Sequence, residues 1–268
     1  MERIEDVMKY PDDVIYNDQE LQDGQSYDKL SGAFEMKDVT FGYSKLDEPL
    51  IKNFNLSVKP GERIAFVGES GCGKSTLSKL ISGLNQPWSG EITFDGKKAT
   101  EIDRSIFTGS LAVVDQDIIL FEDSIKENIK MWDSSIEDFE VILASRDAQI
   151  HDDIMERPGG YQYKIIEGGK DFSGGQRQRL EIARVLAQDP TIIILDEATS
   201  ALDALTEYEV VKAIKNRGIS CIVVAHRLST IKNCDEIIVM DKGRIIDRGT
   251  HKELMQTSEL YQKLVVNE

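Results

Sequence analysis

The sequence predicts an α/β fold with a parallel central β-sheet, a small antiparallel β subdomain and an inserted helical subdomain. One basis for this prediction is a glycine-rich segment at 68–76, which stands between an apolar run at 64–67 and leucines at helical spacing. The other is a set of later apolar runs, each four to seven residues long and each followed by polar residues. Such runs are typical of strands that are covered on both faces.

The composition is that of a folded chain with a strong negative charge. Its 268 residues are 40% hydrophobic and carry a formal net charge of −16. This charge argues against a nucleic-acid partner, because no basic surface can displace counterions from phosphates, and it disfavours an anionic membrane surface. The three cysteines, Cys72, Cys221 and Cys234, have no metal-ligand spacing and indicate a reducing cytosol. No apolar run approaches the roughly 20 residues of a membrane helix, and the acidic start is unlike a signal peptide.

Residues 1–30 are predicted to be a linker, because they contain nine acidic against three basic side chains and few apolar ones. The segments that follow, 34–43 and 56–58, are strand-like and predict an antiparallel sheet, which 91–96 joins after a second turn. Tyr43 is a candidate to stack on an adenine ring. The competing interpretation is a core aromatic residue, which is the commoner use of an aromatic in a strand.

The segment 68–76 matches the phosphate-binding pattern G-x-x-x-x-G-K-[ST], and the strand and helix that flank it disfavour a chance match. Glycines let the backbone bend around a phosphate with its N–H groups turned inward, and the new helix adds its positive end. Lys74 adds a point charge for phosphoryl chemistry, and Ser75 offers a hydroxyl to Mg²⁺. The other predicted nucleotide contacts of this loop are Gly68, Ser70, Gly71, Cys72, Gly73 and Thr76.

Residues 117–170 are mostly amphipathic and helical in pattern, and we place the inserted helical subdomain at about 117–185. Within it, Ser173 and Gln176 have the spacing of a helix capping box. Capping does not explain the two glycines between them, Gly174 and Gly175, each of which destabilises a helix by about 1 kcal/mol relative to alanine. We therefore expect a close approach to this backbone, with an anion at the helix N-terminus as the natural candidate.

Polar residues follow the apolar runs at 111–114, 192–195 and 219–225, and ligands of parallel sheets lie beyond such strand ends. Asp196 is predicted to hold Mg²⁺ together with Ser75 and Gln116. Glu197 is predicted to polarise the attacking water, since strand alternation keeps it from repeating the role of Asp196. Gln116 is placed to reach the metal or the water, and His226 to reach the γ-phosphate.

The C-terminal part of the chain predicts a hairpin and one helix. The hairpin covers 237–246 and turns at 241–243. Thr250 and Glu253 then have the spacing of a capping box for a single final helix.

Together these motifs resemble the nucleotide-binding domain of an ATP-binding-cassette (ABC) transporter over about residues 31–268. The resemblance implies a P-loop NTPase (RecA-like) core with an antiparallel β subdomain and an inserted α-helical subdomain, and an ATPase that uses ATP and Mg²⁺. In that family the matching segments are Walker A at 68–76, Walker B with its catalytic glutamate at 192–197, the adenine-stacking loop at Tyr43, the Q-loop at Gln116, the signature motif at 173–176, the D-loop at 200–203 and the switch histidine at His226.

The resemblance also implies partners. ABC domains form a head-to-tail homodimer on ATP binding, in which Ser173, Gly175 and Gln176 of one copy close on the Walker A nucleotide of the other. A transmembrane domain of the same transporter would precede residue 1, so this chain would be a soluble part of a longer protein at the cytoplasmic face of the bacterial cell membrane. Two segments depart from the family: Phe172 replaces the usual leucine, and 167–169 matches the exporter segment only loosely.

Exporter versions of the motifs are similar to 196–203 and 225–231. The segments 87–90, 150–152 and 157–161 are similar to bacterial bacteriocin-type exporters of the nitrile-hydratase-like leader peptide system, which implies peptide export. The first alternative is a non-transport ABC-type ATPase of DNA repair or chromosome organisation, but only about 100 residues without heptads separate Lys74 from Ser173. A small-molecule P-loop kinase would have no use for a signature motif, and a module that binds ATP without turnover would have no use for Glu197.

Overall fold

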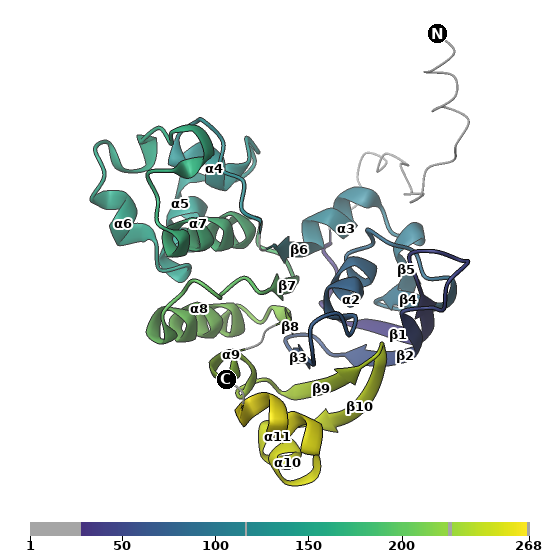
Figure 1. Cartoon of the computed structure of the whole chain (residues 1–268). Helices are drawn as coiled ribbons and strands as arrows, with labels where there is room; N and C mark the ends of the chain where they lie inside the picture. The colour runs from purple at the N-terminus through teal and green to yellow at the C-terminus, as the bar shows by residue number, and fades with distance from the viewer. Residues whose placement is uncertain (1–27, 116, 225–226, 267–268) are drawn as a thin grey trace.

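Two β-sheets and the helices that cover them make up the described part of the chain (Figure 1). The computed structural model describes residues 28–115, 117–224 and 227–266. The predicted linker at 1–30 therefore lies almost wholly outside the described residues. Among the residues that are described, no helix combines the length and the apolar character that crossing a bilayer requires.

The central sheet contains the apolar runs that the sequence predicted to be strands. Its five parallel strands carry one antiparallel strand, β10, at the edge beside β9. In spatial order the strands are β10 (Arg244–Gly249), β9 (Glu236–Asp241), β3 (Arg63–Val67), β8 (Ser220–Val224), β7 (Ile192–Asp196) and β6 (Leu111–Val114).

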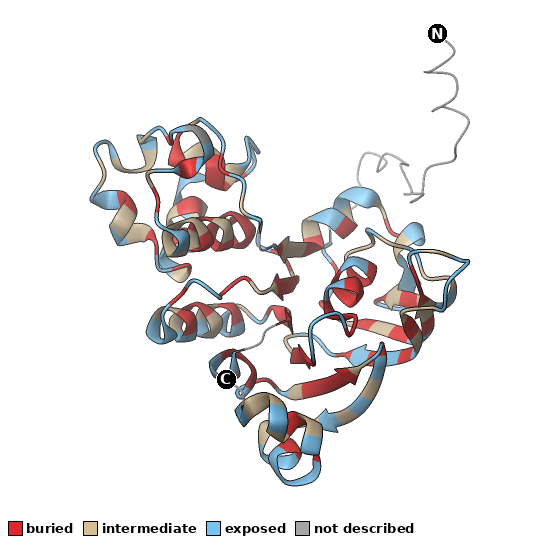
Figure 2. Ribbon diagram, viewed as in Figure 1, coloured by how far each residue is buried: buried red, intermediate tan, exposed pale blue. Residues whose placement is uncertain are grey.

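Alternation along these strands divides the interior into two cores, because successive side chains of a strand point to opposite faces. Ile64 and Phe66 belong to a core shared with α2 (Lys74–Ile81), α3 (Arg104–Ser110) and the second sheet. Ala65 and Val67 belong to a core shared with the helices on the other face. Figure 2 shows the buried strands between these two layers.

The second sheet is antiparallel, as predicted, and has four strands. In spatial order they are β2 (Ile51–Val58), β1 (Phe34–Phe41), β4 (Ser89–Phe94) and β5 (Lys97–Lys98). The helix α2 ends earlier than the leucine spacing predicted. Gly83, with φ of 75°, lies just after its end, so Leu84 is outside the helix and 59% exposed.

The opposite face of the central sheet carries α7 (Gly174–Ala187) and α8 (Ala204–Asn216). Three shorter helices lie in the segment where a helical subdomain was predicted; the first two pack against α7, and the third packs against the second (Figure 1). These are α4 (Ile125–Lys130), α5 (Asp138–Asp147) and α6 (His151–Met155). The remaining short elements are α9 (Leu228–Ile231) and the 3₁₀ turns η1 (Ala99–Glu101), η2 (Gly160–Gln162) and η3 (Glu167–Gly169).

The C-terminal segment confirms the predicted hairpin but not the single final helix. The structure has two helices, α10 (His251–Thr257) and α11 (Glu259–Val266), and Thr250 caps the first of them. Between them Ser258 is extended, with φ of −109°, and its hydroxyl donates to Asp247 at 2.5 Å. This hydrogen bond joins the residue between the two helices to β10. The capping pattern could not predict the interruption of the helix, because the bond depends on a residue in another element.

Candidate functional site

The segment 68–76, called the P-loop below, connects β3 to α2 at the carboxyl edge of the central sheet, and its lysine lies inside the loop. Lys74 is 6% exposed. Its ammonium donates to the carbonyl oxygens of Gly68 at 2.8 Å and of Glu69 at 3.0 Å. A buried positive charge is thus held against the main chain of the loop that was predicted to surround a phosphate.

Two glycines of this loop lie close against neighbouring strands. A Cβ at Gly68 would lie 2.4 Å from the carbonyl oxygen of Met240 in β9. Gly73 has φ of 108°, and a Cβ there would lie 2.7 Å from Ile51 in β2. The loop is therefore wedged between the two sheets. Its Cys72 is buried, and this burial raises the pKa of the thiol despite the nearby Lys74.

Ser75 and Asp196, distant in sequence, are in contact. The hydroxyl of Ser75 donates to Asp196 Oδ1 at 3.3 Å, which joins the first turn of α2 to the end of β7. Burial raises the pKa of the Asp196 carboxyl, and the carboxylates of Asp115 and Glu197 raise it further. One carboxylate and one hydroxyl, completed by substrate phosphates, form the kind of oxygen set that Mg²⁺ takes, so these residues fit the predicted metal.

The raised pKa of Asp196 gives a prediction on stability. A carboxyl whose pKa is raised by folding stabilises the fold at low pH, and this contribution is lost as the pH rises through that pKa. At neutral pH the ionised Asp196 therefore lowers the stability of the nucleotide-free protein. Asp196→Asn should raise the melting temperature of the protein at pH 7 by roughly 2–4 °C, the shift that corresponds to about 1 kcal/mol. The effect is no larger because Asp196 is partly exposed and water screens its charge.

Thermal melts of both proteins across a pH series check this expectation. The difference between Asp196→Asn and wild type should narrow as the pH is lowered through the pKa of Asp196. A variant that melts below wild type at pH 7 would show that the carboxylate stabilises the site instead.

Glu197 lies outside the strand and has an unusual backbone. The strand β7 ends at Asp196, and Glu197 has φ of 53°, a left-handed conformation that is uncommon for a residue other than glycine. Its N–H donates to Val224 O of β8 at 2.8 Å. The sequence predicted that strand alternation separates the carboxylates of Asp196 and Glu197. In the structure the left-handed turn of the backbone at Glu197 separates them instead. Backbone strain of this kind is concentrated at functional sites.

Tyr43 also meets the P-loop. Its hydroxyl and that of Thr76 are 3.1 Å apart, and its ring packs edge-on against Phe41 with centroids 5.3 Å apart. The residue is nevertheless 65% exposed, so it is not the core aromatic that its strand position allowed. Ser70 and Gly71 are exposed at the tip of the same loop.

The predicted capping box at the start of α7 is present. The Ser173 hydroxyl accepts from the N–H of Gln176 at 3.2 Å, and the Gln176 amide oxygen accepts from the N–H of Ser173 at 3.0 Å. The helix that they cap packs on the face of the central sheet opposite α2 (Figure 1). The fold thus joins Lys74, Ser75 and Asp196 but carries Ser173 into a different layer.

The sequence predicted that another group lies close to the backbone of Gly174 and Gly175. Within the chain, the segment 200–203 lies close to this backbone. A Cβ at Gly175 would lie 3.0 Å from Ala201 O, so this glycine is already required by the packing of α7 against 200–203. Buried Gln178 reinforces this contact: its amide oxygen accepts from the N–H of Ala201 at 2.9 Å, and its Nε2 donates to Ser200 Oγ at 3.3 Å. Sequence reasoning missed Gln178, which reads as an ordinary polar helix residue.

A second residue that sequence reasoning missed is Glu207, which is 2% exposed in the first turn of α8. Its carboxylate accepts hydroxyl hydrogen bonds from Thr199 at 2.6 Å, from Ser229 at 2.7 Å and from Thr230. It thereby ties the segment after Glu197 to α9. The sequence carried no signal for this role, because an acidic residue near a helix N-terminus is common.

Two predicted site residues, Gln116 and His226, lie outside the described residues, so their roles stay predictions. A flanking residue of the second is described: Arg227 donates to the carbonyl oxygens of Leu202 at 2.7 Å and of Thr199 at 3.3 Å. The segment next to His226 is therefore held against the turn that follows Glu197.

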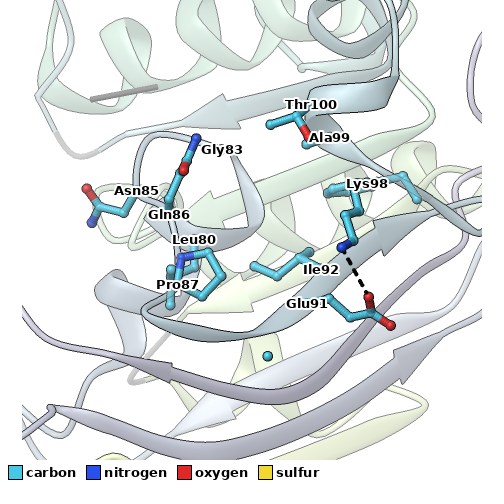
Figure 3. A pocket seen from close by; sticks show the side chains of 12 residues that line it. Leu80, Gly83, Asn85, Gln86, Pro87, Glu91, Ile92, Lys98, Ala99 and Thr100 are labelled. Atoms are coloured by element: carbon cyan, nitrogen blue, oxygen red, sulfur yellow. Dashed lines mark ion pairs between the residues drawn. The ribbon is translucent and has the colours of Figure 1, made fainter. Parts of the chain in front are cut away.

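A separate hollow of about 200 Å³ lies between α2 and β4 (Figure 3). Its floor is apolar, with Leu80 and Ile92, and an ion pair between Glu91 and Lys98 at 3.6 Å borders it. All of its lining residues fall within 80–100, so it is distinct from the contacts of Lys74, Ser75 and Asp196.

Comparisons with known proteins show which family this chain resembles. The pattern of the ABC transporter family matches residues 51–200. An uncharacterised ABC transporter ATP-binding protein of Bacillus subtilis is 38% identical over 245 residues, which are 91% of this chain and 43% of that protein. A Staphylococcus aureus protein, named provisionally as a multidrug export ATP-binding/permease protein, is 40% identical over 256 residues, 94% of this chain and 44% of its own length.

Among solved structures, a bacterial Atm1-family ABC exporter with ATP bound superposes with a TM-score of 0.88 at 32% identity. The alignment covers 98% of this chain and 46% of that one. The chain therefore spans less than half the length of the relatives that it matches.

Proposed function

We propose, from the premise that this chain belongs to the ABC transporter family, that it binds and hydrolyses ATP as the ATP-binding domain of an exporter. ATP-binding domains of this family are ATPases. The observation that carries the proposal is the contact between Ser75 and Asp196 beside the buried Lys74, because it brings phosphate-binding and metal-binding groups together from two separate elements.

The roles of the site residues follow from their chemistry. Lys74 and the N–H groups of 68–76 bind the phosphates of ATP, and Tyr43 stacks on the adenine. Ser75 and Asp196, with Gln116, would hold Mg²⁺, which when bound neutralises charge on the phosphates. Glu197 accepts a proton from the attacking water. His226 contacts the γ-phosphate.

A second copy of the chain completes the site in this proposal. Ser173, Gly175 and Gln176 stand at the start of α7, in a layer away from the P-loop of their own chain. A head-to-tail homodimer would bring them to the nucleotide of the partner copy, with the helix N-terminus and the serine hydroxyl directed at the γ-phosphate.

We further infer that a transmembrane domain of the same protein couples this ATPase to export of a bacteriocin-type peptide at the cytoplasmic face of the bacterial membrane. The segments 87–90, 150–152 and 157–161 support peptide cargo, whereas the Staphylococcus aureus relative is named for multidrug export. In vesicles holding the full-length protein, a peptide with its leader should stimulate hydrolysis. Stimulation by a drug alone would favour drug export, and stimulation by neither would favour a non-transport ATPase.

Removal of the P-loop lysine gives a prediction on binding. Lys74→Ala should weaken ATP affinity by about 10- to 100-fold, because a hydrogen bond between charged groups contributes about 1.5–3 kcal/mol. Equilibrium titration with a fluorescent ATP analogue measures this loss. The matched control is Lys79→Ala, at an exposed position on the same helix, which should bind as wild type. Equal affinities for wild type and Lys74→Ala would remove Lys74 from the phosphate site.

A further inference from the structure

Arg157, which follows α6, contacts the residue directly before the signature serine. Its guanidinium carbon lies 3.6 Å from the ring centroid of Phe172 and 4.9 Å from that of Tyr163. The two rings meet edge-on, with centroids 6.5 Å apart. Phe172 is 3% exposed and the side chain of Arg157 is 16% exposed, so the stacked cation is largely shielded from water, the condition in which cation–π attraction is strongest.

The same guanidinium is bonded to Asp171. It donates from Nη2 to the carbonyl oxygen at 2.9 Å and from Nη1 to the carboxylate at 3.2 Å. The other carboxylate oxygen of Asp171 is buried without a hydrogen-bond partner among the described residues. Arg157 is therefore the cation that offsets this carboxylate. Lysine could not reproduce the arrangement, because it lacks the planar fork of donors.

Further contacts hold Phe172 and the capping box from other sides. Arg177 of α7 donates to Phe172 O at 2.8 Å. Asp153 of α6 accepts from Gln176 at 2.7 Å and pairs with Arg179 at 2.8 Å. The short α6 and the turn after it thus contact the chain on both sides of Ser173.

We propose that Arg157 is a positioning residue for Ser173, acting through Phe172 and Asp171. This inference rests on the proposed function, in which Ser173 meets the γ-phosphate bound by a partner copy. The serine needs a fixed position, because a hydrogen bond weakens steeply when its angle departs from linearity. Arginine and phenylalanine form one unit here: leucine at 172 would remove the nearer of the two ring faces and leave the guanidinium only that of Tyr163, so phenylalanine in place of the usual leucine suits Arg157.

The test is a double-mutant cycle of ATP hydrolysis with Arg157→Met, Phe172→Leu and the double variant. Each single variant should lower kcat about five- to tenfold, the loss expected for a shielded cation–π pair with its hydrogen bonds. Because both substitutions break the same pair, the kcat of the double variant should be no lower than that of the less active single variant. The affinity of the monomer for ATP should change less than twofold. Arg157→Lys should recover only part of the loss, and exposed Arg146→Met is the matched control.

Three results would each overturn the inference. They are a wild-type kcat in Arg157→Met, a loss of kcat in the double variant equal to the product of the two single losses, and a loss of ATP affinity that parallels the loss of kcat. If Arg157→Met fails to fold, Phe172→Leu alone decides, because unchanged kcat there contradicts the pair. Ser173→Ala separates this result from the proposed function. If Ser173→Ala hydrolyses ATP normally, the proposed contact of Ser173 with the γ-phosphate is wrong; if it is impaired while Arg157→Met is not, only the inference fails.

Discussion

Glu197→Gln should lower the rate of ATP hydrolysis by about 10²- to 10⁴-fold, the range that a general base contributes. Glutamine keeps the size and the hydrogen-bonding reach of the side chain but cannot take a proton from water. The left-handed backbone at Glu197 and its main-chain bond to Val224 of β8 should be retained, so ATP should still bind. Steady-state release of phosphate measures the loss.

The same variant should accumulate the ATP-bound homodimer, because closure would no longer be followed by hydrolysis. Gel filtration with ATP and Mg²⁺ should then show a species of twice the 30.1 kDa chain. Glu209→Gln is the matched control, since it makes the same chemical change on the surface of α8, beside Lys212. Hydrolysis by Glu197→Gln at the wild-type rate would exclude Glu197 as the base.

The second large effect is expected at Ser173. Ser173→Ala should lower kcat by about 10²- to 10³-fold, as does loss of one donor to a developing oxyanion, while the affinity of the monomer for ATP changes less than twofold. The substitution also removes a helix cap, which contributes about 1 kcal/mol to stability. Ser124→Ala removes the equivalent cap of α4 and is the matched control, which should retain activity.

Mixing two inactive variants tests whether Ser173 acts on the partner copy. In a dimer of Ser173→Ala with Lys74→Ala, one of the two composite sites has both residues intact. An equal mixture should therefore recover roughly a quarter of wild-type hydrolysis, since half of the dimers are mixed and each has one working site. No recovery would mean that Ser173 serves the P-loop of its own chain.

Local patterns predicted the framework of the site because their physical causes are local. The run at 192–195 is a strand because apolar residues in succession suit a sheet covered on both faces, and the structure ends that strand at Asp196. Ser173 and Gln176 cap α7 because both partners lie within one turn of a helix. The same reasoning failed at Ser258, where a hydrogen bond to Asp247 in another element divides the predicted helix.

Residues whose roles depend on distant partners were the ones missed. Gln178 and Glu207 look like ordinary helix residues, and only folding brings Ala201 to the first and Ser229 to the second. Gly175 is an unusual residue for the first turn of a helix, and this showed in the sequence. The carbonyl of Ala201 that lies against it comes from a separate loop, so the sequence could not identify it.

By itself, the sequence predicted the type of site, since the spacing within 68–76 is typical of a loop that turns its N–H groups toward a phosphate. The tertiary structure decided which groups share that site. It joined Ser75 to Asp196 and carried Ser173 to the opposite layer, because strand order and the packing of helices on two faces depend on contacts between residues far apart in the chain.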